Sequence, residues 1–327
     1  MPEADSSGAP IAVAAAQQDP DWLPPEINTN VAHSARVYNY WLGGKDNFAA
    51  DRALGDAIIK AVPSTVFGAR ANRAFLGRAV RYLAAEAGIR QFLDIGTGIP
   101  TADNTHEVAQ AIAPDSRALY VDNDPIVLAH ARALMTSNPV GSTAFIHADL
   151  RDPDKILNDP KLRATLDLGR PVALMLIAVL HFLTEADNPQ GIVRRLLDAL
   201  PSGSYLTITH LTADFVSPEE AAVAEAAGRD AGVTYAPRSQ AEVTEFFSGL
   251  DLVDPGVVPL LAWRPDGGAP ENPRAASVYA AIGRKPLGFT RCLGRTPPER
   301  TASCRSSAWL PRAPARPAPA GACPLMP

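Results

Sequence analysis

The sequence predicts an α/β protein with a doubly wound, mostly parallel sheet and an antiparallel strand at one edge. From residue 91 onward, short apolar runs alternate with longer stretches of helical period, the pattern of parallel strands connected by helices. The most apolar run, residues 172–177, is typical of a strand at the centre of such a sheet. The last two strand-like runs, 252–258 and 278–282, are joined by a proline-containing segment without helical period. We therefore expect them to pair antiparallel at an edge.

The N-terminal part of the chain should contain helices only. Residues 1–25 have no sustained period and are predicted to be disordered. Serines 34 and 64 can cap helices, and Gly43-Gly44 can end one. The helices predicted there span residues 34–42, 51–61 and 64–88. We expect this region, 28–88, to form a helical lid on a domain that spans residues 26–285.

Beyond residue 90, strands and helices are predicted to alternate. The strands are expected at 91–94, 118–122, 143–147, 172–177 and 205–209. The helices are expected at 104–112, 125–137, 189–200, 218–231 and 240–247. Residues 151–169 are charged and less regular, and no element is predicted there.

The C-terminal stretch 286–327 is predicted to be a disordered Pro/Arg-rich tail. From Arg284 onward the chain holds eight basic residues and one acidic residue, which leaves 22 basic and 34 acidic residues, a net charge of −12, in residues 1–283. A body this acidic is not expected to bind nucleic acid. The tail also holds all three cysteines, Cys292, Cys304 and Cys323, so disulfides and thiolate sites are excluded from the domain. We favour a tail without a role over a basic interaction tail.

Neither a membrane nor a secretory route is expected from the sequence. The longest apolar run, residues 171–183, is too short to cross a bilayer and contains His181. The first five residues are acidic where a secretory signal would be basic. We therefore expect a cytoplasmic protein.

Two predicted strands end in the residues that carry the strongest functional signal. The first runs into Asp94-Ile95-Gly96-Thr97-Gly98, and the second ends at Asp122-Asn123. In a doubly wound sheet these ends open onto one crevice, where nucleotide-like ligands bind. Gly96, Thr97 and Gly98 would let the backbone approach such a ligand, and Asp122, beside Asn123, would accept hydrogen bonds from a ribose diol.

Two details favour S-adenosylmethionine over a dinucleotide at this turn. Pro100 removes an N–H that a pyrophosphate would need, and Thr101 stands where a dinucleotide turn has a small residue. Asp94 would repel a pyrophosphate, whereas it suits a ligand with an ammonium and a sulfonium. A glycine turn without a ligand remains the alternative.

Further candidates follow the third and fourth strands. Asp149 could accept a hydrogen bond from an adenine amine, and the N–H of Leu150 could address a ring nitrogen. His181 follows the fourth strand and is the candidate general base, with a packing histidine as the alternative. His33, His106 and His210 lack metal-ligand spacing, and we predict no metal site.

An aromatic-rich segment, residues 36–48, is predicted to close over the cofactor, because closure excludes water and positions the substrate. An aromatic face packed on the core is the alternative. The candidate lid residues are Arg36, Tyr38, Tyr40, Gly43, Gly44, Lys45, Asp46 and Phe48.

The sequence resembles an actinobacterial family of S-adenosylmethionine-dependent methyltransferases that was long catalogued as a domain of unknown function. The similarity covers roughly residues 28–285 and rests on 35–48, 70–76, 92–101, 120–125, 178–183 and 263–265. It implies a class I methyltransferase fold and S-adenosylmethionine as cofactor, but no substrate. Such families carry Asp where this chain has Asn39 and Leu at positions 41 and 99, which leaves the role of Asn39 open.

The leading hypothesis is therefore a methyltransferase that acts on a small-molecule acceptor. Its mechanism would depend mainly on positioning the two reactants. A non-catalytic protein that binds S-adenosylmethionine and a dinucleotide-dependent oxidoreductase are the alternatives. The oligomeric state is not predicted.

Overall fold

A mixed sheet forms the centre of the computed structural model, which describes residues 27–134 and 138–287. Its strands are β1 (Gln91–Ile95), β2 (Arg117–Asp122), β3 (Ser142–His147), β4 (Ala173–Ile177), β5 (Tyr205–Leu211), β6 (Asp251–Leu252), β7 (Val258–Pro259) and β8 (Val278–Arg284). Their order is β3-β2-β1-β4-β5-β8-β6, with β7 also paired to β8. The first five strands are parallel, and β8 is antiparallel to β5. The predicted doubly wound sheet with a reversed edge is confirmed.

The edge differs in detail from the prediction. A single strand over 252–258 was expected, but two strands of two residues, β6 and β7, pair with β8 in its place. Between them Gly256 has φ +82° and donates its N–H to Val253 O at 2.8 Å, which makes a turn. Pro255 cannot donate a ladder hydrogen bond, and Gly256 favours the turn, so the pairing is interrupted there.

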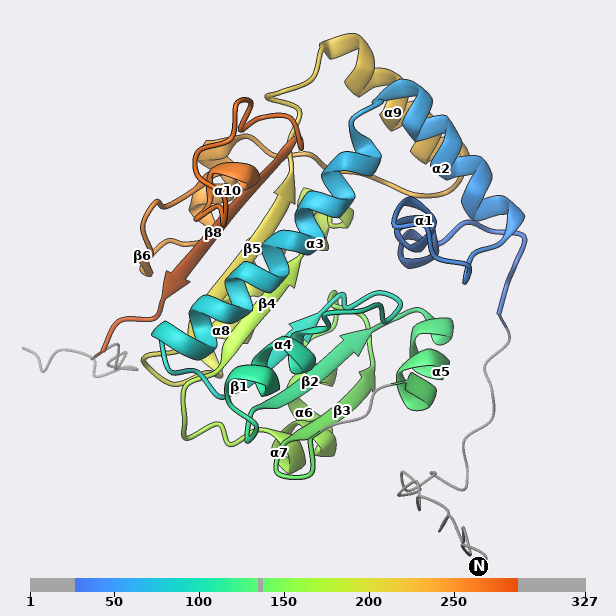
Figure 1. The fold of residues 1–327 in the computed structure, drawn as a ribbon. Coiled ribbons are helices and arrows are strands. Elements are labelled where there is room, and N and C mark those ends of the chain that lie inside the picture. Colours follow the sequence, from blue (N-terminus) through green and yellow to red (C-terminus); the bar gives the residue numbers. More distant parts are fainter. Residues whose placement is uncertain (1–26, 135–137, 288–327) are drawn as a thin grey trace, which may run out of the picture. The chain divides into compact units, whose positions relative to one another are not determined.

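Helices cover both faces of the sheet, because successive strand side chains point to opposite sides. Phe92, Tyr120 and Met175 pack in one core, and Leu93, Leu119 and Leu174 pack in the other. The first face carries α3 (Thr65–Arg81), α4 (Thr105–Ile112) and α5 (Pro125–Leu134); the second carries α6 (Pro153–Asn158), α7 (Pro160–Thr165), α8 (Pro189–Asp198) and α10 (Gln240–Glu245). Figure 1 shows α3 lying across β4 and β5.

Two short helices, α6 and α7, occupy part of the segment for which no element was predicted. Asp152 and Asp159 cap them through hydrogen bonds to the N–H groups of Lys155 and Lys161. A proline follows each cap at the first helical position. Asp-Pro is an N-terminal helix signal that the reading of this segment as irregular overlooked. A 3₁₀ turn, Leu260–Ala262, lies in the connection that was expected to lack helix.

The N-terminal helices were located correctly, although their ends differ. The first helix, α1 (Ser34–Trp41), has His33 rather than Ser34 at its N-cap. The second, α2 (Ala49–Ala61), begins earlier than expected because Asp51 accepts a hydrogen bond from Phe48 N at 2.7 Å. The predicted third helix is α3 followed by one π-helical turn, Tyr82–Glu86, and it stops before Gly88 with φ +69°.

The N-terminal helices lie over the carboxyl ends of the parallel strands. Helices α1 and α2 pack with α9 (Pro218–Asp230) around a small apolar cluster made by Val37, Leu54, Ile58 and Val233. Figure 1 shows α1, α2 and α9 beyond the arrowheads of β4 and β5. Helices α1, α2 and α9, together called the helical cap, cover the sheet edge at which ligands bind in this class of fold.

Two features outside the sheet bear on the predicted organisation. Within the described residues no helix combines the length and the apolar character that crossing a bilayer would require. The predicted disordered segment 1–25 and, apart from Pro286 and Leu287, the predicted tail lie outside the described residues.

Candidate functional site

A cavity of about 530 Å³ lies between the carboxyl ends of the strands and the helical cap. This is within the range of small-molecule and cofactor sites, roughly 300–1,000 Å³. The structure brings every predicted cofactor-binding residue and the candidate base to its wall: Asp94, Gly96, Thr97, Gly98, Asp122, Asn123, Asp149, Leu150 and His181. The convergence expected from strand ends in a parallel sheet is therefore present.

The turn after β1 brings bare backbone to the cavity. Gly96 and Gly98 have φ of +78° and +67°, a region that residues with a side chain rarely adopt. A Cβ on Gly96 would lie 2.4 Å from Val179 Cγ2, so the neighbouring loop also requires glycine there. A Cβ on Gly98 would meet no atom within 4 Å. This turn can therefore approach a ligand closely at Gly98.

Each oxygen of the Asp122 carboxylate accepts a hydrogen bond from a backbone N–H group. Its Oδ2 accepts from Gly98 N at 2.8 Å, and its Oδ1 accepts from Asp124 N at 2.9 Å. Burial raises the pKa of this carboxyl above its usual range. Each carboxylate oxygen has a second lone pair, so both can still accept hydrogen bonds from a ribose diol.

Asp94 lies at the end of β1 with little compensation for its charge. Its side chain accepts a hydrogen bond from Thr105 Oγ1 at 2.6 Å, and burial raises its pKa to about 6. Among the described residues none forms an ion pair with it. Arg73 acts only at a distance, because its guanidinium donates to Ala102 O and Asn104 Oδ1. A cationic ligand would supply the missing charge.

The remaining predicted cofactor residues also line the cavity. Asn123 donates its side-chain N–H to Asp149 Oδ2 at 2.8 Å. Asp149 also contacts the Arg151 guanidinium at 3.3 Å. Thr97 donates its hydroxyl to Asp94 O at 3.2 Å, which tightens the turn. Polar groups from β1, β2 and β3 thus face one end of the cavity.

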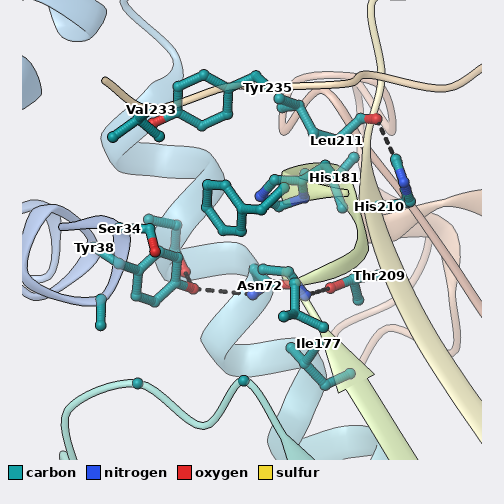
Figure 2. A pocket seen from close by; sticks show the side chains of 18 of the residues that line it. Ser34, Tyr38, Asn72, Ile177, His181, Thr209, His210, Leu211, Val233 and Tyr235 are labelled. Carbon is teal, nitrogen blue, oxygen red and sulfur yellow. Dashed lines mark hydrogen bonds between the residues drawn. The ribbon is translucent and has the colours of Figure 1, made fainter. Parts of the chain in front are cut away.

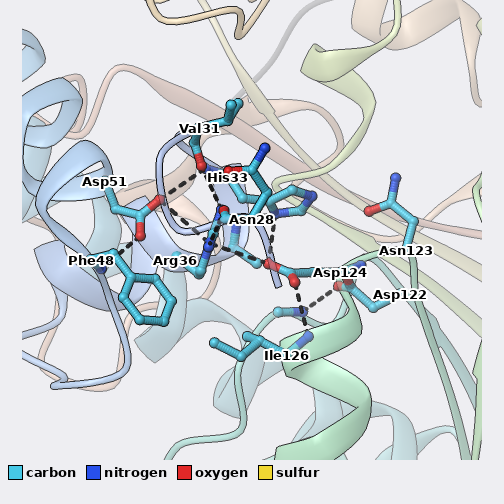
Figure 3. A network of polar contacts seen from close by, with 12 residues as sticks. Asn28, Val31, His33, Arg36, Phe48, Asp51, Asp122, Asn123, Asp124 and Ile126 are labelled. Carbon is cyan, nitrogen blue, oxygen red and sulfur yellow. Dashed lines mark hydrogen bonds and ion pairs between the residues drawn. The ribbon is translucent and has the colours of Figure 1, made fainter. Parts of the chain in front are cut away.

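A buried ionic network next to Asp122 was missed by the sequence analysis (Figure 3). His33 lines the cavity, and its Nδ1 lies 2.9 Å from Asp124 Oδ2. The same nitrogen is 3.4 Å from Ala35 N, so the shorter contact identifies Asp124 as the partner that accepts the Nδ1 proton. Two acidic residues separated by one position at the end of β2, Asp122 and Asp124, were the available signal that a cation had to lie nearby.

Burial alone would lower the pKa of His33. The hydrogen bond that His33 donates to Asp124 and the charges of Asp124 and Asp122 outweigh burial and raise that pKa above 6.5. The imidazolium and Asp124 therefore hold the start of α1 against the end of β2.

Arg36, a predicted lid residue, belongs to the same network. Its Nε lies 3.4 Å from Asp51 Oδ1 and 3.7 Å from Asp124 Oδ2. Its other nitrogens donate to Asn28 O and Val31 O at 3.1 and 2.7 Å. Arg36 therefore anchors the irregular segment before α1, and it is not among the described residues that line the cavity.

Of the eight candidate lid residues, Tyr38 lines the cavity. Tyr40 donates its hydroxyl to Asp56, Asp46 contacts His130, and Phe48 lies under the Arg36 guanidinium, whereas Lys45 is exposed. Gly43 and Gly44 form the turn after α1. Closure of this segment over the cofactor stays a prediction.

The structure gives Asn39 a local role. It is buried, and its Oδ1 accepts from Asp46 N at 3.1 Å and Asn47 Nδ2 at 3.0 Å. Both contacts need only an acceptor oxygen, which an aspartate in the same place would also supply. Asn39 thus holds the loop that follows Gly44.

His181 faces the other end of the cavity, on the 3₁₀ turn Leu180–Phe182 (Figure 2). Burial lowers its pKa well below 6.5, so the ring is neutral. Its Nδ1 is buried and has no hydrogen-bond partner among the residues that the structure describes. A neutral imidazole with a free ring nitrogen can exchange a hydrogen bond with a ligand, or accept its proton.

Arg238, a second residue that the sequence analysis missed, holds the His181 turn in place. Its guanidinium donates to Leu180 O at 3.2 Å, to Leu183 O at 3.0 Å and to His210 Nε2 at 3.0 Å. His210 Nδ1 lies 2.7 Å from Leu211 O, which fixes the proton on Nδ1 and leaves Nε2 as the acceptor. His210 also lines the cavity, and burial lowers its pKa to about 4.

Comparison with known proteins agrees with this site. Residues 20–286 match a family model described as S-adenosyl methyltransferase. A solved DUF574 family protein from Streptomyces avermitilis MA-4680 is 50% identical, with a TM-score of 0.77, over 80% of this chain and 100% of that one. A protein from Thermobifida fusca YX, named as a putative methyltransferase, is 43% identical, with a TM-score of 0.74, over 82% of this chain and 100% of that one. No curated protein matches the chain.

Proposed function

We propose that this chain, which belongs to the S-adenosyl methyltransferase family, transfers the methyl group of S-adenosylmethionine to a small-molecule acceptor. The enzyme class and the cofactor follow from the family. The single observation that supports a small acceptor is the continuous cavity, which extends from the glycine turn to His181 and Tyr235 under the helical cap. A concave space of this size fits a small molecule better than a polymer.

The residues at the glycine end suit the cofactor chemically. Asp94 is a desolvated carboxylate without an ion-pair partner among the described residues, and it would hold a cationic group of the ligand. Asp122 would accept hydrogen bonds from the ribose diol, and Gly98 would let the backbone approach. S-adenosylmethionine, when bound, supplies an electrophilic methyl group on a sulfonium.

His181 is the residue we propose as general base. Its ring is neutral, and its buried Nδ1 has no partner, so it can bind the O–H or N–H of an acceptor and take up the proton. Arg238 and the hydrogen bond from Ala236 N to His181 O fix the turn that carries it. The other residues of the site orient and enclose the reactants.

The proposal extends to partners and location. We expect no nucleic acid or membrane partner, because the body of the chain is strongly acidic. A cytoplasmic location is supported by the absence of cysteine from the sequence between residues 1 and 291.

Calorimetric titration tests the cofactor site. S-adenosylmethionine and S-adenosylhomocysteine should bind, whereas NAD and NADP should not. Asp122→Ala should weaken binding by about 2–3 kcal/mol through loss of charge-assisted hydrogen bonds. Asp115→Ala, which removes an exposed carboxylate paired with Arg90, should leave binding unchanged. Tighter binding of a dinucleotide would refute the proposal.

Turnover tests the role of His181. Formation of S-adenosylhomocysteine should be measured with a panel of small-molecule acceptors. With an acceptor identified in this way, His181→Gln should lower turnover about 10²-fold or more while cofactor affinity stays unchanged. Equal turnover in the variant would remove His181 from the chemistry.

A further inference from the structure

The part of the cavity beyond the cofactor end has a distinct lining. We call it the acceptor chamber and define it by Tyr38, Asn72, His181, Phe182, Val233 and Tyr235, all of which line the cavity. Figure 2 shows Tyr38, Asn72 and His181 coming from α1, α3 and the turn after β4, with Val233 and Tyr235 from the segment after α9. Phe182 lies on the same turn as His181. Elements far apart in the sequence therefore build one small compartment.

Aromatic rings make up one wall of the acceptor chamber. The rings of His181 and Phe182 have centroids 4.4 Å apart, and those of Phe182 and Tyr235 are 5.5 Å apart. His181 and Tyr235 are stacked at 6.3 Å with an interplanar angle of 26°. Burial raises the pKa of Tyr235 well above 10, so its phenol stays neutral. A wall of this kind offers offset or edge contacts to a flat ring.

Two buried polar atoms of the acceptor chamber have no hydrogen-bond partner within residues 27–134 and 138–287. Tyr38 donates its hydroxyl to Ala69 O at 2.9 Å and accepts from Asn72 Nδ2 at 2.9 Å. These bonds orient the amide, so that Asn72 Oδ1 remains as a buried acceptor without a donor. His181 Nδ1 is also buried and unpartnered. Buried polar atoms normally have a partner, so the pattern indicates a ligand that brings an O–H or N–H group.

None of the six residues that define the acceptor chamber is charged, since the His181 ring is neutral. Between Ile177 and Val278, Glu225 is the one charged residue among the described residues that line the cavity. Arg238 is not in the lining, and its guanidinium is occupied by Leu180 O, Leu183 O, His210 and Glu185. Elsewhere in the lining, His33 and Arg151 are paired with Asp124 and Asp149, and Arg73 donates to Ala102 O and Asn104 Oδ1. The buried Nε of Arg73 has no hydrogen-bond partner among the described residues. A carboxylate or phosphate placed among the six chamber residues would have no charged side chain of the chamber beside it, at a large desolvation cost.

We propose that the acceptor chamber binds an uncharged, flat aromatic compound that carries a hydroxyl or N–H group. This inference rests on the proposed function. The ring lies against Phe182 and Tyr235, and its O–H or N–H is directed to Asn72 Oδ1 and His181 Nδ1. In the transfer, the heteroatom forms a bond to the methyl carbon as the carbon–sulfur bond of S-adenosylmethionine breaks. The sulfur leaves with that electron pair as a thioether, and the proton passes from the heteroatom to His181.

The test compares three probes on protein saturated with S-adenosylhomocysteine, by calorimetric titration. The probes are 2-naphthol, 2-naphthoic acid and decahydro-2-naphthol, which differ in charge or planarity at similar size. 2-Naphthol should bind at least about tenfold more tightly than the other two, because it alone combines a neutral donor with a flat ring. Equal or tighter binding of 2-naphthoic acid or decahydro-2-naphthol would overturn the inference.

Two variants at one position give the matched control. Tyr235→Ala should weaken 2-naphthol binding about tenfold through lost ring contact, and Tyr235→Phe should keep it within about twofold. The affinity for S-adenosylhomocysteine should be the same in both variants, which shows that the fold is intact. Unchanged 2-naphthol binding in Tyr235→Ala would refute the chamber assignment alone. If the unmodified protein did not bind S-adenosylhomocysteine at all, the proposed function itself would fail.

Discussion

Replacing Asp94 by asparagine should stabilise the ligand-free protein and weaken cofactor binding at the same time. Asp94 is 4% exposed, its carboxylate accepts a hydrogen bond from Thr105 at 2.6 Å, and burial raises its pKa to about 6. The charged form is therefore held in the native state at a cost. Asparagine keeps the shape and an acceptor oxygen for Thr105 but carries no charge.

The magnitude follows from the two pKa values. A native pKa of about 6, compared with 3.8 for the free side chain, corresponds to about 3 kcal/mol at 1.36 kcal/mol per pKa unit. Between these values the native state retains a proton that the unfolded state has released, so the contribution of Asp94 to stability falls as pH rises through that window. Above pH 6 the loss is complete, and the asparagine variant does not suffer it.

Urea denaturation without ligand measures the difference. At pH 7.5 the Asp94→Asn variant should be more stable by roughly 2–3 kcal/mol, and the difference should shrink toward pH 4.5. Asp115→Asn, a change to an exposed carboxylate, should show no such difference. In a parallel calorimetric titration Asp94→Asn should bind S-adenosylmethionine at least about tenfold more weakly, since the anion that balances the ligand is gone.

A variant that is less stable than the unmodified protein at pH 7.5 would refute this reasoning, as would a stability difference independent of pH. Either result would mean that Asp94 already has a charge partner in the ligand-free state. Undiminished cofactor binding with the expected stability gain would separate the two parts, because the burial argument would stand while Asp94 lost its role in binding.

Two further substitutions test the N-terminal segment. His33→Gln removes the stability contribution of the imidazolium, which is present below pH 6.5 and is lost as pH rises through the raised native pKa. The difference in melting temperature from the unmodified protein should therefore be largest near pH 5.5. A difference that stays constant to pH 8.5 would contradict the His33–Asp124 pair. Gly44→Ala should lower the free energy of unfolding, measured by urea denaturation, by about 1–3 kcal/mol, because its Cβ would lie 2.2 Å from Asn39 Nδ2. The control Gly267→Ala, whose Cβ would meet no described atom within 4 Å, should lower it by less than about 0.5 kcal/mol. Equal losses in the two variants would show that the Asn39 side chain moves freely.

Local signals were sufficient for most of the fold. The alternation of apolar runs and helical stretches predicted β1 to β5 and, apart from α6 and α7, the α-helices between them, since side-chain period depends on neighbouring residues. The Asp-Pro starts of α6 and α7 were also local and could have been recognised. The division of the expected edge strand into β6 and β7 was harder to foresee, because both pair with β8 rather than with each other.

The candidate site divides in the same way. Asp94, Asp122 and Asp149 could be grouped from the sequence because the carboxyl ends of parallel strands meet at one edge. The histidine that lines the cavity beside Asp122, and the arginine that holds the His181 turn, could not be assigned. Their partners, Asp124 for His33 and Leu180 O for Arg238, come from distant segments, so the residues next to His33 and Arg238 in the sequence do not indicate them.

The sequence by itself determined the fold class, the strand-end residues of the cofactor site and the family resemblance, because these depend on spacing and side-chain type along a short stretch of chain. Only the tertiary structure decided that Tyr38 faces the cavity while Arg36 anchors the segment, and that burial raises the pKa of Asp94 to about 6. It also decided that Asn72 and His181 present unpartnered atoms to one chamber. Which side chains face the cavity, which groups are charged and which polar atoms find a hydrogen-bond partner all depend on burial and on the charges nearby. Both arise when α1, α3 and the segment after α9 pack over the same sheet edge.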